Sequence, residues 1–137
     1  MKRKGIQRLA LILTLCLLLS TVAFATVDSS AYISAMSANI TYSGNDVNVY
    51  FTVVGRHLMD EIGVSEIRLF ELNGNKWTKV YTFYADDPDY TGDMLSYNAS
   101  AKADQVTYSG DSTKSYFAIL YFYAADAYGS DTIEYIT

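Results

Sequence analysis

Cysteine, histidine and proline are almost absent from this chain, since each occurs once among its 137 residues. The one cysteine, Cys16, falls in an N-terminal apolar run, so the remainder has no disulfide to stabilise it. The one histidine, His57, has no cysteine partner after that run, and no G-x-S-x-G nucleophile sequence is present. A small hydrolase would need an acid pair or a His57 constellation in a cleft. We therefore predict that the protein is not an enzyme.

Long apolar runs are also scarce, and the longest one has the organisation of a secretory signal peptide. Four basic residues come first, at Lys2, Arg3, Lys4 and Arg8. An apolar stretch over 9–19 and the A-x-A sequence at 23–25 follow them. The stretch holds about 11 residues, fewer than the roughly 20 that a spanning helix needs. We predict a signal peptide over 1–25, a linker over 26–30 and a secreted, extracellular domain over 31–137; a retained anchor is the alternative.

Positive charge becomes scarce once the leader is removed. Four of the ten basic residues lie in residues 1–25 and all fifteen acidic residues lie beyond them, so the net charge changes from −5 to −9. A surface of that sign repels nucleic acid and anionic membranes. We expect neither as a partner, and no membrane span after cleavage. The remaining length suits one domain with one core.

Helical periodicity is absent, and short alternating apolar runs take its place. They predict seven strands, over about residues 32–42, 47–53, 65–72, 77–84, 94–108, 115–124 and 132–137. We expect Gly55 to close the second strand, with His57 in the loop after it. Asn73-Gly74 is a strong hairpin signal. Seven short strands separated by turn residues predict an all-β fold, a single antiparallel β-sandwich.

Tyr116 favours an immunoglobulin-like type of sandwich. Such domains often place a tyrosine at the start of the sixth strand, where its hydroxyl ties down the preceding corner. The inner residue two places later is often cysteine, and Ala118 occupies that place here. The alternative is that Tyr116 is simply one of thirteen tyrosines, a residue that suits strands.

Three segments resemble recurring features of small uncharacterised exported proteins of Gram-positive bacteria. They are residues 59–64 (MDEIGV), 86–90 (DDPDY) and 106–110 (VTYSG). The resemblance covers most of residues 31–135. It implies an immunoglobulin-like or fibronectin-type-III-like β-sandwich, and it implies no known activity or site.

The run from Tyr116 to Tyr123 has no charged residue on either face. If Tyr116 points into the core, every second residue after it points inward and the others point outward. If the strands pair as in an immunoglobulin sheet, the outward Phe70 lies beside this row. The candidate binding residues are Phe70, Trp77, Phe117, Ile119, Tyr121 and Tyr123. Exposed aromatic patches are typical of surfaces that bind a partner or self-associate. Long side chains such as Arg68 and Lys79 could cover this row instead.

Trp77 also suggests a second kind of binding, to a cell-surface or cell-wall glycan, because flat aromatic rings stack on sugar faces. It follows the predicted hairpin, so its ring is either exposed or caps the edge of the core. Tyrosines elsewhere are as well explained by their preference for half-buried strands.

An acidic loop is a candidate calcium site, and calcium is the only cofactor that the sequence suggests. Its acids are Asp86, Asp87, Asp89 and Asp93. Calcium takes six to eight oxygen ligands, although the spacing here does not match an EF-hand loop. The alternative is that these acids only keep the surface solvated. The sequence thus predicts an exported binding or structural module whose partner is an unknown protein, a second copy of itself or a glycan.

Overall fold

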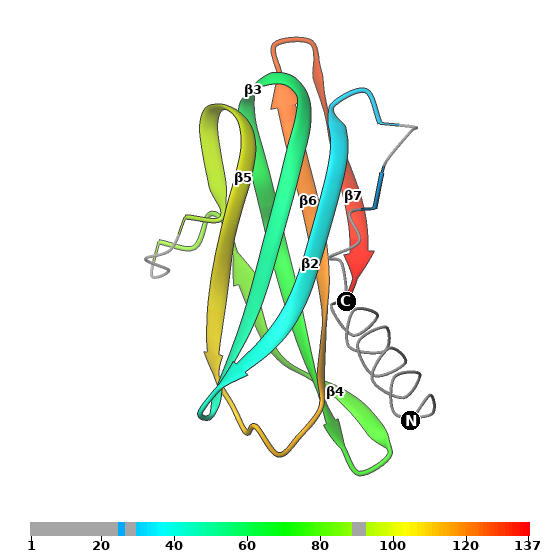
Figure 1. Ribbon diagram of the computed structural model, residues 1–137, viewed down its shortest axis with the longest axis vertical. Coiled ribbons are helices and arrows are strands. Elements are labelled where there is room, and N and C mark those ends of the chain that lie inside the picture. The colour runs from blue at the N-terminus through cyan, green and yellow to red at the C-terminus, as the bar shows by residue number, and fades with distance from the viewer. Residues whose placement is uncertain (1–24, 27–29, 89–92) are drawn as a thin grey trace, which may run out of the picture.

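Antiparallel strands make up most of the described chain (Figure 1). The computed structural model describes residues 25–26, 30–88 and 93–137. The strands are β1 (Ala25–Thr26), β2 (Ile33–Ser43), β3 (Asp46–Asn73), β4 (Lys76–Tyr84), β5 (Leu95–Ser109), β6 (Tyr116–Asp126) and β7 (Gly129–Ile136). Every pairing is antiparallel, and no described residue is helical. The predicted all-β class is confirmed. Nearly all of the predicted signal peptide lies outside the described residues.

β3 is the organising strand, because it pairs with four others. Its first part, up to residue 55, pairs with β2 and with the end of β5. Its second part, from Met59, pairs with the start of β5, with β6 and with β4. Figure 1 shows β3 curving over at one end of the molecule between these two parts, with β5 following the same course. The sheet therefore curls. Its strand order is β1-β2-β3-β6-β7, and β4 and β5 pair with β3 beside that path.

The prediction of separate strands over 47–53 and 65–72 is wrong, because β3 continues through both. Gly55 does not close a strand, and the exposed His57 lies within β3 rather than in a loop. A Cβ atom at Gly55 would lie 3.0 Å from the His57 carbonyl oxygen and 3.2 Å from Ile62 Cδ1. The missing side chain lets the strand bend tightly while its pairing with β5 resumes at Met59 after a register shift.

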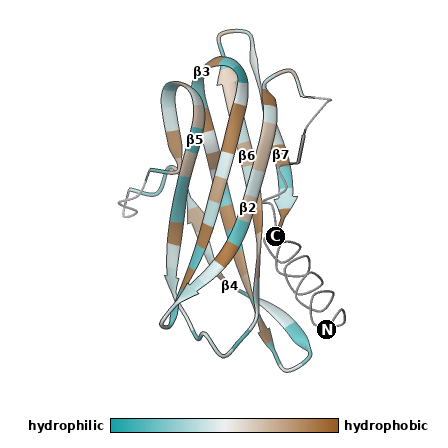
Figure 2. Ribbon diagram, in the orientation of Figure 1, coloured by the Kyte–Doolittle hydropathy of each residue, from teal (hydrophilic) through white to brown (hydrophobic). Residues whose placement is uncertain are grey.

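One hydrophobic core lies inside the curl, and both parts of β3 contribute to it. The predicted inward residues are buried: Val47, Val49, Phe51, Val53, Ile67, Leu69, Tyr116, Ala118, Leu120 and Phe122. Figure 2 shows the resulting alternation of hydrophobic and hydrophilic residues along the strands. Burial of this apolar surface is the main stabilising contribution in a domain whose described residues include no cysteine.

Two-residue turns join the strands at one end. Ser43 pairs with Asp46 around Gly44, and Asn73 pairs with Lys76 around Gly74. Both glycines have positive φ, 60° and 62°, which a residue with a Cβ adopts at a cost. The predicted Asn73-Gly74 hairpin is confirmed.

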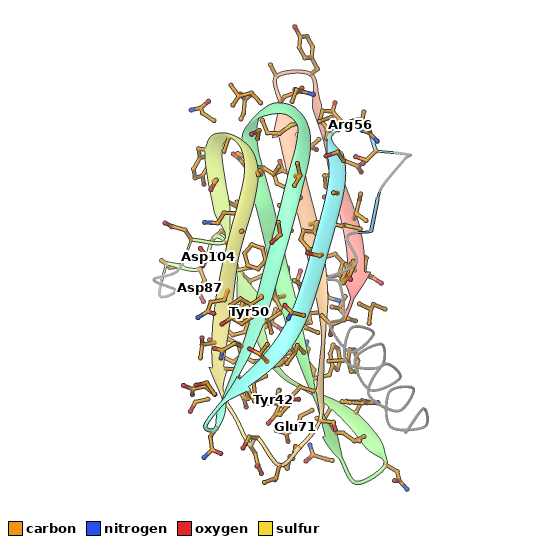
Figure 3. All side chains as sticks on the ribbon, viewed as in Figure 1. Tyr42, Tyr50, Arg56, Glu71, Asp87 and Asp104 are labelled. Carbon is orange, nitrogen blue, oxygen red and sulfur yellow. The ribbon has the colours of Figure 1, made fainter. Side chains whose placement is uncertain are left out.

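Tyr116 anchors the β5–β6 connection at this same end. Its hydroxyl accepts a hydrogen bond from the Asp111 backbone N–H (2.9 Å) and donates one to Glu71 Oε2 (2.6 Å). The other Glu71 oxygen accepts one from Lys114 Nζ at 2.8 Å. Burial and the Glu71 carboxylate raise the pKa of Tyr116 to about 12, while the Lys114 ammonium lowers the pKa of Glu71. The predicted tie from Tyr116 to the preceding corner is confirmed. Figure 3 places Glu71 near Tyr42 here and Arg56 at the opposite end.

Candidate functional site

The candidate site is the solvent-facing side of β4, β3, β6 and β7, which we call the outer face. Strand register places Phe70 opposite Phe117, Arg68 opposite Ile119 and Glu66 opposite Tyr121. The predicted outward residues Phe117, Ile119, Tyr121 and Tyr123 all lie half-buried on this side. The structure thus brings five of the six candidate binding residues onto β3 and β6, and Trp77 onto the adjacent β4.

One end of the outer face is a closed group of three rings, the aromatic cluster of Phe70, Trp77 and Phe117. The rings of Phe70 and Phe117 stack with centroids 4.7 Å apart and planes within 1° of parallel. Trp77 meets Phe117 edge-on, at 4.8 Å and 81°. These geometries contribute beyond simple burial. The rings cover one another, although Trp77 remains 42% exposed.

The middle of the outer face is covered by charged side chains. The Arg68 guanidinium lies 4.9 Å from the centroid of the Tyr121 ring, and its Nε donates to Glu66 Oε1 at 2.5 Å. Burial, with a hydrogen bond to Glu134, raises the pKa of Tyr121. The sequence left open the alternative that Arg68 covers the outward aromatic row. This alternative is confirmed at Tyr121. Ile136 of β7 pairs with Ile119 and stays 58% exposed.

The other end of the outer face contains an open hollow of about 470 Å³. It lies where β3 changes its neighbour on one side: Gly63 is the last residue to pair with β5, and Glu66 is the first to pair with β4. The two neighbours diverge there and leave a gap. Glu61, Ser65, Glu66, Tyr84, Ala85, Asp86, Leu95, Tyr97 and Tyr123 line the hollow.

The β3 backbone between the lining residues Glu61 and Ser65 requires a glycine. A Cβ atom at Gly63 would lie 2.1 Å from the carbonyl oxygen of Met94. That close approach lets the Met94 carbonyl accept a hydrogen bond from the Val64 N–H at 3.0 Å. On the other side, the Ala85 N–H donates to the Ser65 carbonyl, also at 3.0 Å. Both walls are therefore attached to β3 by backbone hydrogen bonds.

The hollow combines aromatic rings with carboxylates. Tyr84 is 46% exposed and Tyr97 is 66% exposed, so both rings are accessible to a ligand. Glu66 is paired with Arg68, whereas no ion pair among the described residues involves Glu61 or Asp86. The Ser65 hydroxyl donates to the Tyr121 carbonyl at 3.3 Å. The arrangement offers ring faces and hydrogen-bond acceptors to whatever enters.

His57 lies at the opposite end from Glu71, paired with Asp126. Its Nε2 is 2.7 Å from Asp126 Oδ2, and its side chain is 50% exposed. The His57 ring lowers the pKa of Asp126, whose second oxygen accepts from the N–H groups of Tyr128 and Gly129. This geometry joins the bend of β3 to the β6–β7 turn.

The predicted calcium ligands are only partly described. Asp86 and Asp93 are exposed and Asp87 is half-buried, whereas Asp89 lies outside the described residues. Residues 30–88 and 93–137 contain no group of three or more acidic or histidine side chains arranged to hold a metal. The calcium site stays a prediction that depends on Asp89.

Comparisons with protein-family models, curated proteins and solved structures found no match for this chain. The described part of the chain contains no helix long and apolar enough to cross a membrane. The function must therefore be argued from the outer face itself.

Sequence reasoning missed the hollow and most of the residues that line it. Of the lining residues, the sequence predicts only Tyr123 as a binding residue and Asp86 as a metal ligand. The alternation of Phe83 inward and Tyr84 outward could have placed Tyr84 on the outer face. Nothing in the sequence around Tyr97 indicated that this residue would stand beside Tyr84.

Proposed function

We propose that the protein is an exported, non-catalytic binding module with an immunoglobulin-like β-sandwich. The strand pairings support the sandwich. The first part of β3 lies between β2 and the end of β5, while its second part lies beside β4 and β6, with β7 next to β6. Two such groups of strands that enclose a shared core, with Tyr116 tied to its corner, are features of this type of domain.

Export is supported by the order of basic, apolar and A-x-A segments in residues 1–25. Protein recovered from the culture medium of a secreting bacterial host should begin at Thr26 when its N-terminus is sequenced. Full-length protein that stays in the cell fraction would contradict export.

The observation that carries the binding function is the continuity of the outer face. The aromatic cluster, the Ile119–Ile136 pair and the hollow follow one another along β6. Exposed apolar or aromatic side chains occur in each: Trp77, Ile136, Tyr84 and Tyr97. Exposed apolar and aromatic side chains gathered on one face, here on either side of the Arg68–Tyr121 contact, are typical of interaction surfaces. We therefore assign partner binding to the outer face, with a protein or a second copy of the chain as the partner.

The test changes Tyr121, at the middle of the outer face, and compares it with a tyrosine elsewhere. Tyr50 is 41% exposed on the first part of β3, where it pairs with Gln105 of β5. We expect Tyr121→Lys to abolish retention of the natural partner, or concentration-dependent sedimentation if the partner is a second copy, and Tyr50→Lys to preserve it. Equal behaviour of both variants and the wild type would exclude the outer face as the binding surface.

Glycan binding is the second candidate, and the exposure of Trp77 favours it. Contact with Phe117 holds the Trp77 ring in place while 42% of the residue remains accessible. Because Trp77 is the only tryptophan, its fluorescence reports directly on this site. Glycan binding predicts that cell-wall polysaccharide quenches the fluorescence and that Trp77→Ala loses all hits on a glycan array. Unchanged fluorescence together with an empty array would eliminate this candidate.

A further inference from the structure

We infer that the hollow binds a cationic side chain, of lysine or arginine, presented by a partner protein that docks on the outer face. This inference rests on the proposed function and specifies the chemistry of the partner. Three observations carry it: the tyrosine rings that line the hollow, two carboxylates there without an ion pair, and the position of the hollow on the outer face.

Three tyrosines surround the hollow from three different strands. Tyr84 ends β4, Tyr97 lies near the start of β5 and Tyr123 lies on β6. The face of an aromatic ring attracts a cation placed within about 6 Å of its centre. The outer face already contains one such contact, between Arg68 and Tyr121. The hollow also has tyrosine rings, but the described residues place no cation over them.

The carboxylates of the hollow give it negative charge. Of Glu61, Glu66 and Asp86, only Glu66 has a cationic partner among the described residues, and that partner is Arg68. A cation that entered between the tyrosines would therefore meet two carboxylates that form no ion pair in the described structure. The net charge of the whole chain is also negative, which accelerates association with basic partners.

The hydrogen-bonding groups of the hollow suit a cation, because most of them are acceptors. Carboxylates only accept, and lysine and arginine side chains only donate. The Ser65 hydroxyl already donates to a carbonyl, and Arg68 is held by Glu66. Among the lining side chains only the tyrosine hydroxyls remain as donors, and an ammonium or guanidinium group needs none.

The shape of the hollow favours a side chain attached to a larger partner over a free small cation. The hollow is open, and beyond Tyr123 the outer side of β6 presents Tyr121, which Arg68 covers, and then Ile119. A partner with apolar residues beside its cation would cover both regions at once. A small cation would leave the apolar part exposed, so its affinity would be lower.

Two peptides test the inference directly by nuclear magnetic resonance titration of the purified protein. Both have the sequence acetyl-Gly-Ser-Leu-X-Leu-Ser-Gly-amide, with X either lysine or norleucine, which has a similar length and no charge. We expect the lysine peptide to bind about tenfold more tightly, with shifts at Tyr84, Tyr97 and Tyr123, and salt to weaken it. Equal affinity of the two peptides would overturn the inference.

Matched variants locate the binding. Tyr97→Leu and Glu61→Gln should each weaken the lysine peptide about fivefold or more. Tyr50→Leu and Asp60→Asn are the controls, because they remove an exposed ring and an exposed acid outside the hollow. Lysine-peptide binding that Tyr97→Leu and its control weaken equally would contradict the assigned site.

The same titration is repeated with two alternative ligands, a small cation and a sugar. Tetramethylammonium that binds as tightly as the lysine peptide would overturn the choice of a protein partner. Chitohexaose that displaces the peptide would overturn the choice of a cation. Loss of the natural partner in Tyr121→Lys, with equal lysine and norleucine affinities, would leave the proposed function intact and refute only this inference.

Discussion

At one end of the outer face the rings of Phe70, Phe117 and Trp77 pack against one another. At the other end Tyr84 and Tyr97 line an open hollow. Both ends belong to the same face, and both are rich in aromatic residues. The difference lies in the strands beneath them. Beside Phe70, β3 has β4 on one side and β6 on the other, and the rows of side chains are complete. At the hollow β3 exchanges β5 for β4, and the row is interrupted. Aromatic content alone thus does not distinguish packing from a binding site.

The largest expected effect comes from adding a side chain at Gly63, where β3 lies close to Met94. Gly63→Ala would force its Cβ into the Met94 carbonyl and break the hydrogen bond to Val64, so we expect a loss of about 3 kcal/mol in the free energy of unfolding. Gly74→Ala, which meets no atom within 4 Å but keeps a φ of 62°, should cost about 1 kcal/mol. Urea denaturation measures both. Similar losses would show that the wall of the hollow is not closely packed.

The next effect compares the two ends directly. Phe117→Ala removes the ring that contacts both Phe70 and Trp77, and because Phe117 is half-buried we expect a loss of about 2 kcal/mol. Tyr97→Ala removes a 66% exposed ring and should change stability by less than about 0.5 kcal/mol. Thermal and urea unfolding of the two variants give the contrast. A greater loss in Tyr97→Ala would mean that the hollow is a packed region.

The free energy of unfolding should also depend on pH through Tyr116 and Glu71. Because the folded-state pKa of Tyr116 is raised to about 12, its contribution is complete below about pH 10 and is lost as pH rises through 12. The pKa of Glu71 is lowered, so its contribution is present above about pH 4 and lost as pH falls. We expect Tyr116→Phe to cost about 1.5 kcal/mol at pH 7 and to flatten the alkaline loss. Tyr50→Phe, the control, should retain the wild-type profile across pH 4 to 12.

The smallest expected effect concerns the acidic loop next to the hollow. A site of about 1 mM affinity would add about 1 kcal/mol at 5 mM calcium, and a few degrees to the melting temperature. Chelator should reverse the rise, and Asp89→Asn should abolish it while Asp131→Asn leaves it unchanged. An unchanged melting temperature at 5 mM calcium would show that the loop acids bind no calcium and only keep the surface solvated.

Alternation of apolar residues predicted much of the fold. It placed Val47 and Val49 inward, because a strand has a simple period of two. The Asn73-Gly74 turn followed from its two residue types, and Phe70 beside Phe117 followed from the assumed immunoglobulin-like pairing. The sequence prediction failed at Gly55, where glycine normally ends a strand but here permits a bend. It also failed at Tyr97, because the place of that ring depends on which strand β3 pairs with at Gly63, and pairing partners are far apart in the chain.

The continuity of β3 through its bend has a consequence for how the molecule folds and unfolds. β3 forms pairs that are far apart in the sequence, such as Asp46 with Ser109, and pairs that are close, such as Asn73 with Lys76. Among the described strands, only the β1–β2 and β6–β7 pairs do not involve β3. Neither part of the sheet can persist alone, so we expect a single cooperative transition, with the backbone amides of both parts of β3 exchanging at one common, slow rate. The long-range pairs should also make folding slow for a chain of this size.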